Sequence, residues 1–281
     1  MGTVNLLPLT PPGSTPVRVM TIAGSDSGGG AGIQADLRTF AMLGVHGCVA
    51  VVAVTVQNSV GVKAFHEIPL DIIAGQIEAV TSDIGIAAAK TGMLASAEII
   101  ETVAATWRAE GLEDTPLVVD PVCASMHGDP LLHHSALDSL RNTLFPLATL
   151  ITPNLDEVRL LVDIDVIDED SQHRAAQALH ALGPKWVLVK GGHLRGATES
   201  PDLLYNGREF HQYSTPRIDT GHDHGAGDTL AAATTCALAH GYSVPDAIGF
   251  AKGWVTECLR AAYPLGHGHG PVNALFRLQA P

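Results

Sequence analysis

A glycine-rich segment late in the chain carries residue types that phosphate chemistry needs. Residues 220–229 read Thr-Gly-His-Asp-His-Gly-Ala-Gly-Asp-Thr and precede an alanine-rich stretch that is typical of a helix. Small residues let successive backbone N–H groups face one point, and a helix start adds partial positive charge there. Gly225, Ala226 and Gly227 therefore predict an anion hole. Asp228, in the first helical turn, is placed as a general base for an alcohol, although an acidic residue also simply favours a helix start.

Other polar side chains each follow a short apolar run that resembles a buried strand. They are Asp120, Asn154 with Glu157, and Lys190. Ligands of open α/β sheets bind beyond the carboxyl ends of the strands, so we expect these side chains to meet at one edge. Oxygen ligands suit Mg²⁺, and a lysine beside two glycines can reach a phosphate. Asn154 and Glu157 also match a capping box, which is a purely structural device.

A second glycine-rich loop lies near the start of the chain. Residues 24–32 read Gly-Ser-Asp-Ser-Gly-Gly-Gly-Ala-Gly. No Gly-Lys-Ser/Thr follows, so the loop is not a phosphate-binding Walker loop, and Gly28-x-Gly30-x-x-Ile33 lacks the last small residue of a dinucleotide fingerprint. Two interpretations stay open: a turn that caps a helix, and a loop where backbone meets a small substrate.

Strands and helices must hold these residues in place. Short apolar runs alternate with helix-like segments along most of the chain. The expected strands cover 17–23, 47–56, 87–90, 116–120, 147–152 and 185–190. The expected helices cover about 34–43, 70–83, 96–110, 135–144, 155–162, 171–182, 227–240 and 244–262. Asn206-Gly207 predicts a hairpin between 202–205 and 209–213. The alternation predicts an α/β fold with helices on both faces of a mostly parallel sheet.

Composition separates a leader from one large domain. Residues 1–16 carry four prolines and predict a flexible leader, whereas residues 17–281 show no composition break and no repeat. We therefore expect a single domain over 17–281.

The net charge of the chain argues against some classes of binding partner. With 29 acidic and 16 basic residues the net charge is −13, and no Lys/Arg cluster suggests nucleic acid. A phosphate ligand must then be held by backbone N–H groups, helix starts and a metal ion. Four cysteines match no zinc spacing and suit a reducing cytoplasm. No apolar run reaches the ~18 residues of a membrane span, and no basic n-region of a signal peptide opens the chain. We expect a cytoplasmic protein that binds no membrane.

Nine segments together carry a family resemblance. They read Ala23-Gly24-Ser25-Asp26, Gly29-Gly30-Ala31-Gly32-Ile33-Gln34-Ala35-Asp36, Val56-Gln57-Asn58, Lys90-Thr91-Gly92-Met93-Leu94, Asp120-Pro121-Val122, Gly128-Asp129, Thr152-Pro153-Asn154, Lys190-Gly191-Gly192-His193 and Gly225-Ala226-Gly227-Asp228. From about residue 17 to about residue 273 the chain resembles the hydroxymethylpyrimidine/phosphomethylpyrimidine kinases of thiamine biosynthesis. The resemblance implies the ribokinase-like three-layer sandwich and, by analogy, a homodimer.

The resemblance also implies a reaction and an acceptor pocket. The family uses ATP and Mg²⁺ to phosphorylate 4-amino-5-hydroxymethyl-2-methylpyrimidine, and then phosphorylates the product to the pyrophosphate. By motif match, Gly24, Asp36, Gln57 and Met93 line the pyrimidine pocket. The amide of Gln57 offers the donors and the acceptor that a ring nitrogen beside an exocyclic amine requires.

The remaining roles follow the same match. Asp120 and Glu157 are expected at the metal, and Asp228 with residues 225–227 at the transferring group. The expected ATP contacts are Lys190, Asn154, Thr220 and His224. The His-x-His pairs at 222–224 and 267–269 could suggest a transition metal, but Mg²⁺ is the ion that phosphoryl transfer uses.

One position departs from the family pattern. Many members carry Cys where this chain has Asp228, the residue of sugar kinases in the wider superfamily. A carboxylate suits an alcohol acceptor, but it repels a phosphate acceptor unless Mg²⁺ or Lys190 offsets the charge. The alternatives are a pyridoxine or pyridoxal kinase, a sugar kinase, and a non-catalytic pyrimidine-binding protein. The front loop argues against a sugar, and intact Asp228 and Lys190 argue against a silent protein.

Overall fold

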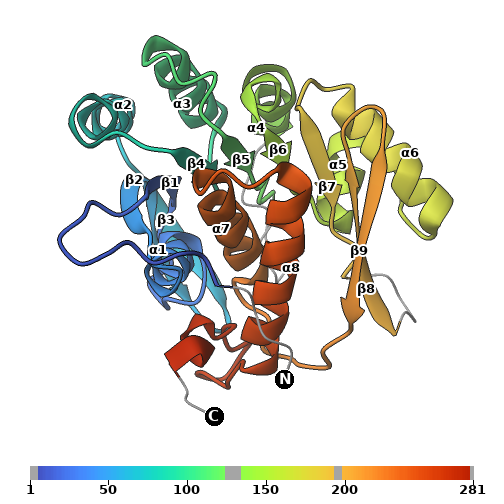
Figure 1. The fold of residues 1–281 in the computed structure, drawn as a ribbon. Helices are drawn as coiled ribbons and strands as arrows, with labels where there is room; N and C mark the ends of the chain where they lie inside the picture. The colour runs from blue at the N-terminus through green and yellow to red at the C-terminus, as the bar shows by residue number, and fades with distance from the viewer. Residues whose placement is uncertain (1–5, 124–133, 193–197, 279–281) are drawn as a thin grey trace.

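The apolar runs of the sequence become the inner strands of one nine-stranded sheet. A computed structural model describes residues 6–123, 134–192 and 198–278. The strand order is β3-β2-β1-β4-β5-β6-β7-β8-β9 (Figure 1). The strands are β1 Arg18–Gly24, β2 His46–Asn58, β3 Gly61–Glu67, β4 Ala88–Thr91, β5 Leu117–Val119, β6 Leu150–Ile151, β7 Trp186–Val189, β8 Glu199–Tyr205 and β9 Phe210–Pro216.

The central strands run parallel, and antiparallel strands lie at both edges. Strands β2, β1, β4, β5, β6 and β7 pair in parallel, whereas β3, β8 and β9 pair antiparallel to their neighbours. Every residue of β4 and β5 is buried, as in a sheet that is covered on both faces. The parallel arrangement therefore brings the carboxyl ends of β1 and β4–β7 to one edge.

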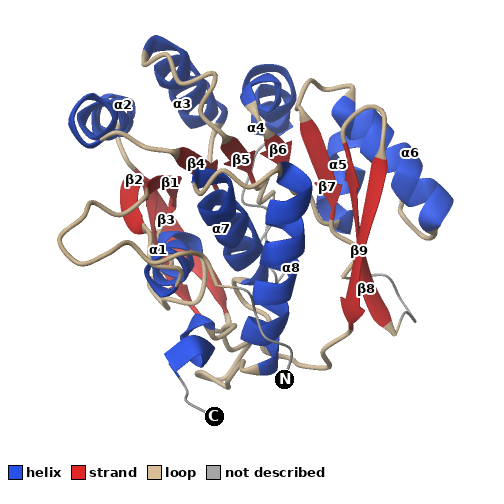
Figure 2. Cartoon of the chain, viewed as in Figure 1, coloured by secondary structure: helices blue, strands red, loops and turns tan. Residues whose placement is uncertain are grey.

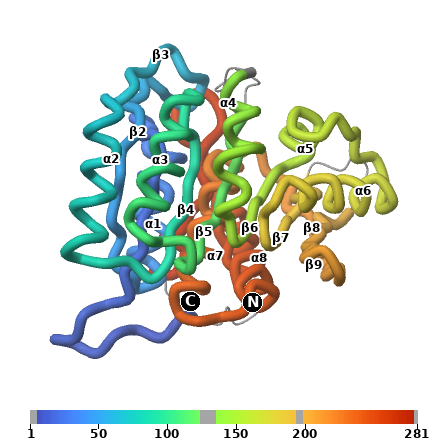
Figure 3. The backbone as a smooth tube through the Cα atoms, turned by 90° about the horizontal axis from the view of Figure 1, so that it is seen from above, coloured from blue at the N-terminus to red at the C-terminus, as the bar shows by residue number. Residues whose placement is uncertain are grey.

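Helices cover both faces of the sheet (Figures 2 and 3). They are α1 Gly32–Met42, α2 Leu70–Ala79, α3 Ala97–Ala109, α4 His134–Ser139, α5 Leu155–Val162, α6 Glu169–His180, α7 Ala226–Ala239 and α8 Val244–Arg260. One buried cluster includes residues of α1, α7 and α8, among them Phe40, Leu230 and Trp254. The other includes residues of the five helices α2, α3, α4, α5 and α6, among them Ile77 and Trp107. The expected three-layer α/β fold is confirmed.

Strand β3 is the one strand in the described residues that our sequence analysis did not predict. It pairs with β2 across the turn at Ser59 and Val60, and most of its side chains are exposed. An edge strand needs no continuous apolar run, because one face meets water. Strand β6 is shorter than expected, because Phe145–Leu147 forms a 3₁₀ turn.

The described part of the proline-rich leader has no helix or strand, but it contacts the domain. The side chain of Leu7 is 2% exposed and belongs to the cluster under α1 and α7, whereas the neighbouring Leu6 is 45% exposed. Leu7 therefore fixes the path of residues 6–16 over the core.

This contact predicts unequal effects for two adjacent leucines. We expect Leu7→Ala to lower the free energy of unfolding by about 2–3 kcal/mol, because it leaves a cavity, and Leu6→Ala to change it by less than about 0.5 kcal/mol. Urea denaturation of both variants measures the difference. Equal, negligible effects would mean that the segment is loose in solution.

Candidate active site

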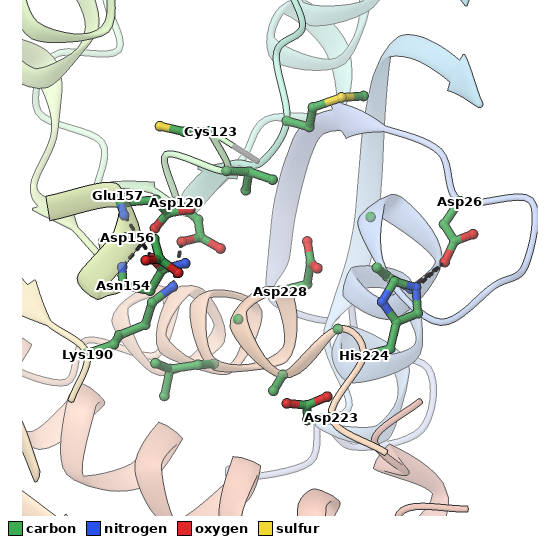
Figure 4. Close-up of a pocket in the computed structure, with 18 of the residues that line it drawn as sticks. Asp26, Asp120, Cys123, Asn154, Asp156, Glu157, Lys190, Asp223, His224 and Asp228 are labelled. Carbon is green, nitrogen blue, oxygen red and sulfur yellow. Dashed lines mark hydrogen bonds and ion pairs between the residues drawn. The ribbon is translucent and has the colours of Figure 1, made fainter. Parts of the chain in front are cut away.

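A cleft of about 1050 Å³ opens where the parallel strands end (Figure 4). Its wall includes twelve of the residues that our sequence analysis selected: Gly24, Gln57, Met93, Asp120, Asn154, Glu157, Lys190, His224, Gly225, Ala226, Gly227 and Asp228. Asp228 lies between a group that contains Asp120 and Lys190 and a second group that contains Asp26 and His224. The cleft thus has two ends with different chemistry on either side of one carboxylate.

The start of α7 presents backbone amides to this cleft. Gly225 has a φ of +78°, and a Cβ there would lie 2.1 Å from the carbonyl oxygen of Gly30, so only glycine fits. The amide of Ala226 donates to the carbonyl of Asp223, at 3.0 Å. The amides of Gly225, Gly227 and Asp228 have no acceptor in the described part of the chain. These donors and the helix dipole form an anion site.

Lys190 and Asp120 form an ion pair beside that helix start. The Lys190 ammonium donates to Oδ1 of Asp120 at 2.9 Å, and Thr152 donates to the same oxygen at 3.0 Å. Burial lowers the pKa of Lys190, but the carboxylates of Asp120 and Glu157 outweigh it and hold the pKa above its ordinary value. A Cβ on Gly227 would lie 3.4 Å from the Lys190 nitrogen, so the glycine lets α7 approach this permanent cation.

Asn154 and Glu157 form the capping box of α5 and also face the cleft. The Glu157 amide donates to the Asn154 side chain at 2.9 Å, and the Glu157 carboxylate accepts from the Asn154 amide at 2.8 Å. Burial raises the pKa of Glu157 to about 7, with a further rise from Asp120, although Lys190 acts in the opposite direction. The capping box is therefore present, and it keeps two oxygen-bearing side chains at the cleft wall.

The other end of the cleft is held together by Asp26, which our sequence analysis quoted but gave no role. Its two oxygens accept from the amides of Gly28, Gly30 and Ala31 at 2.7–2.9 Å, and Oδ2 also contacts Nε2 of His224 at 2.9 Å. Burial raises the pKa of Asp26, but the hydrogen bonds from His224 and the backbone more than offset it and lower the pKa. An ionised carboxylate only accepts, so Nε2 of His224 carries the proton.

That tautomer frees Gln57 for a ligand. The Gln57 side-chain nitrogen lies 3.5 Å from Nε2 of His224, but both atoms are donors, so the contact is no hydrogen bond. The backbone of Gln57 is held by Ser27, which exchanges two hydrogen bonds with it at 2.7 and 2.8 Å. Gly24 completes this end, because a Cβ there would lie 2.4 Å from the terminal carbon of Met93. A rigid backbone therefore presents a side-chain amide that has no hydrogen-bond partner among the described residues.

Three of the selected residues lie elsewhere than expected. Asp36 is fully buried against Lys90 and Thr21 and does not line the cleft, because a charged side chain on the inner face of α1 needs buried partners. Thr220 does not line the cleft either, since its hydroxyl accepts from the amide of His222. His224 lies at the Gln57 end, not beside Lys190 and Asn154.

Some motif residues lie outside the described ranges. They are Gly128, Asp129 and His193.

Fold and site together define a class of protein. A parallel sheet covered on both faces, a cleft at the strand ends, a glycine-made anion site at a late helix and an aspartate beside it are the parts of a ribokinase-like small-molecule kinase.

Comparisons with known proteins narrow the class. The model of the phosphomethylpyrimidine kinase family matches residues 26–273. A hydroxymethylpyrimidine/phosphomethylpyrimidine kinase of Mycobacterium tuberculosis is 71% identical over 275 residues, which cover 98% of this chain and all of the relative. The chain belongs to the phosphomethylpyrimidine kinase family.

Solved structures agree on the fold. A pyridoxal kinase of Bacillus subtilis in complex with ADP superposes with a TM-score of 0.86 at 37% identity, covering 95% of this chain and all of that one. A phosphomethylpyrimidine kinase of Clostridium difficile gives a TM-score of 0.76 at 40% identity, covering 86% and 98%.

The Asp26 hydrogen bonds predict a pH-dependent loss of stability. We expect Asp26→Asn to lower the free energy of unfolding by about 1–3 kcal/mol at pH 7, because charge-assisted bonds are lost. The folded-state pKa of Asp26 lies below its ordinary value of 3.8, so its stabilisation is complete above that pH and is lost as the pH falls further.

Urea denaturation between pH 2.5 and 7 measures this. The gap between parent and Asp26→Asn should close only below about pH 3.8. The exposed Asp114→Asn serves as a control and should show no gap. A gap that persists unchanged at pH 2.5 would contradict the account.

Proposed function

We propose that the chain transfers the γ-phosphoryl group of ATP to the hydroxymethyl group of 4-amino-5-hydroxymethyl-2-methylpyrimidine, and then to the monophosphate product, in thiamine biosynthesis. One observation carries the proposal: Asp228 and the α7 amides, which have no acceptor among the described residues, face the same cleft as the side-chain amide of Gln57. The names of the relatives supply the acceptor.

The acceptor fits the Gln57 end. The pyrimidine presents a ring nitrogen beside an exocyclic amine, which pairs with the acceptor and the donors of one amide. Met93 and Gly24 supply an apolar wall and a close backbone approach. In this pose the hydroxymethyl group points toward Asp228, the carboxylate at the middle of the cleft.

ATP occupies the other end. Its phosphates lie over residues 225–228, with Lys190 and Asn154 at their side. A solved relative holds ADP, which supports a nucleotide at this site. Because the whole chain is acidic, a few fixed donors must gather the phosphate charge, and the α7 amides and Lys190 are such donors.

The donor set fits Mg²⁺ in the way that phosphoryl transfer uses it. Oδ1 of Asp120 accepts two hydrogen bonds, whereas Oδ2 accepts none from the described residues. Glu157 adds a second carboxylate at the same wall. The described residues hold no cluster of three or more metal-binding side chains, so the ion would be shared with water and phosphate oxygens, as Mg²⁺ prefers. When bound it neutralises phosphate charge.

The first transfer then needs only positioning and one base. The acceptor oxygen forms a bond to the γ-phosphorus as the bond to the bridging oxygen breaks and ADP leaves. Asp228 takes the hydroxyl proton, and the amides of 225, 227 and 228 stabilise the charge on the equatorial oxygens. The second transfer has a phosphate acceptor, which needs no strong base, so Lys190 and Mg²⁺ matter more there.

Pyridoxal is the second candidate acceptor. Solved relatives named pyridoxal kinase are 34–37% identical over more than nine tenths of the chain. Pyridoxal is also a heteroaromatic hydroxymethyl compound that a free amide can bind. A mass assay of the products with the pyrimidine, its monophosphate and pyridoxal as acceptors ranks the three. We expect the pyrimidine to react fastest.

We also propose a cytoplasmic homodimer. Val54 and Val56 leave apolar side chains exposed at the β2–β3 edge, where a second copy could cover them. Within the described residues, no helix has both the length and the apolar character needed to cross a bilayer.

The base assignment predicts a selective loss of activity. Asp228→Asn should lower kcat for the hydroxymethyl acceptor by about 10²–10⁴-fold, because proton removal is lost. It should lower turnover of the monophosphate much less and leave the Kd of ATP within about threefold.

A matched control separates this role from a helix-start role. Asp246 occupies in α8 the third helical position that Asp228 occupies in α7. Asp246→Asn should keep the parent kcat. Turnover of both variants is measured as ADP release. An unchanged rate in Asp228→Asn would show that Asp228 is not the base.

A further inference from the structure

A buried lysine lies directly beneath the proposed base. The Lys90 side chain, at the end of β4, is 0% exposed, and its ammonium lies 2.9 and 3.0 Å from the two oxygens of Asp36. The same nitrogen lies 3.5 Å from Oδ1 of Asp228. One ammonium thus serves two carboxylates, with short contacts to the buried one and a longer contact to the one that faces the cleft.

Burying the Lys90 ammonium costs free energy, so several partners are needed to stabilise it. A charged lysine in the core loses its hydration, and only close opposite charges make up for it. Burial lowers the pKa of Lys90, but Asp36, Asp228 and Asp120 outweigh burial and raise the pKa above its ordinary value. Thr21 donates to Asp36 at 2.6 Å from the far side. Lys90 is therefore a permanent cation with a fixed position.

Lys90 acts only through Asp228. It does not line the cleft, whereas the Asp228 side chain is 16% exposed and does. Gly92 removes the side chain that would separate the two, since a Cβ there would lie 3.3 Å from the Lys90 nitrogen and 3.8 Å from the Asp228 oxygen. The second oxygen of Asp228 has no hydrogen-bond donor among the described residues. It can therefore accept a hydrogen bond from the hydroxyl of the acceptor substrate.

We propose that Lys90, anchored by Asp36, is a positioning residue that holds one oxygen of Asp228 in place as its counter-charge, so that the other oxygen meets the acceptor. The inference rests on the proposed function, in which Asp228 takes the acceptor proton. It also gives Asp228 a counter-charge on the side away from ATP, which lets a carboxylate tolerate incoming phosphates.

The other charged groups around Asp228 do not replace Lys90. Asp36 of α1 and Asp120 after β5 bear carboxyl groups and supply no positive charge, Asp223 lies in the loop before α7, and His224 is committed to Asp26. Lys190 acts on Asp228 from the nucleotide end but is bound to Asp120. Lys90 is the cation in direct contact with Asp228 in the described part of the chain.

Two variants should move Asp228 in opposite directions. In Asp36→Asn the lysine keeps its charge and has only Asp228 as a partner, so the carboxyl should take up its proton at lower pH than in the parent. In Lys90→Met/Asp36→Asn the buried pair is removed together, which avoids an unpaired buried charge, and proton uptake should occur at higher pH by about one unit or more.

Carbon-13 NMR titration of the Asp228 carboxyl, assigned by its loss in Asp228→Asn, measures both shifts without any acceptor. Thr21→Val is the matched control: it removes a buried contact of Asp36 but no charge, so the titration midpoint should stay within about 0.3 units of the parent. The acid side of the kcat profile with the hydroxymethyl acceptor should shift with the NMR midpoint in each variant.

The outcomes are separable. Midpoints that stay at the parent value, or that move in one direction in both charge variants, would overturn the role of Lys90 even if the enzyme is active. Parent protein that forms no product from the pyrimidine would refute the proposed function, while opposite NMR shifts would still support Lys90 as the counter-charge in contact with Asp228.

Discussion

The site depends on the close contact of two glycine-rich loops that are far apart in the sequence. His224 and Asp26, 198 residues apart, are joined by a 2.9 Å contact. A Cβ on Gly225 would lie 2.1 Å from the Gly30 oxygen, and a Cβ on Gly30 would lie 2.4 Å from the His224 ring. Only glycine at both places lets the anion site of α7 sit against the loop that borders Gln57. The distance between the two substrates is therefore fixed by backbone, which varies less than side-chain positions.

Charge is the second constraint on this cleft. Under the proposed function, a chain with a net charge of −13 must hold a highly negative nucleotide without a broad basic surface. The two ammonium groups nearest to Asp228 are tied to carboxylates, Lys190 to Asp120 and Lys90 to Asp36 and Asp228, and the His224 imidazole contacts Asp26. These pairs fix the direction of each positive charge, and the α7 amides add donors that carry no net charge. Preorganised donors of this kind need little rearrangement during the reaction.

Much of this could be read from sequence because the signals are local. Apolar runs predicted the buried parallel strands, and Asn206-Gly207 predicted the β8–β9 hairpin. The rule that ligands bind at strand ends predicted that Asp120, Asn154 and Lys190 would line one cleft, as they do. The long-range partners were not readable. Asp36 lies on the buried face of α1 with Ile33 and Phe40, and Lys90 is the third of four buried residues in β4, so each position indicated a buried partner whose identity the sequence did not give. Strand β3 gave no such signal, since it meets water along the edge of the sheet.

The most direct test of the account is a crystal structure with ADP, aluminium fluoride, Mg²⁺ and the hydroxymethylpyrimidine. We predict that the fluoride group, which mimics the transferring phosphoryl, accepts hydrogen bonds from the amides of Gly225, Gly227 and Asp228. The hydroxymethyl oxygen should lie within hydrogen-bonding distance of the Asp228 carboxylate. A fluoride group bound away from the start of α7, or an acceptor whose hydroxyl points away from Asp228, would contradict the account.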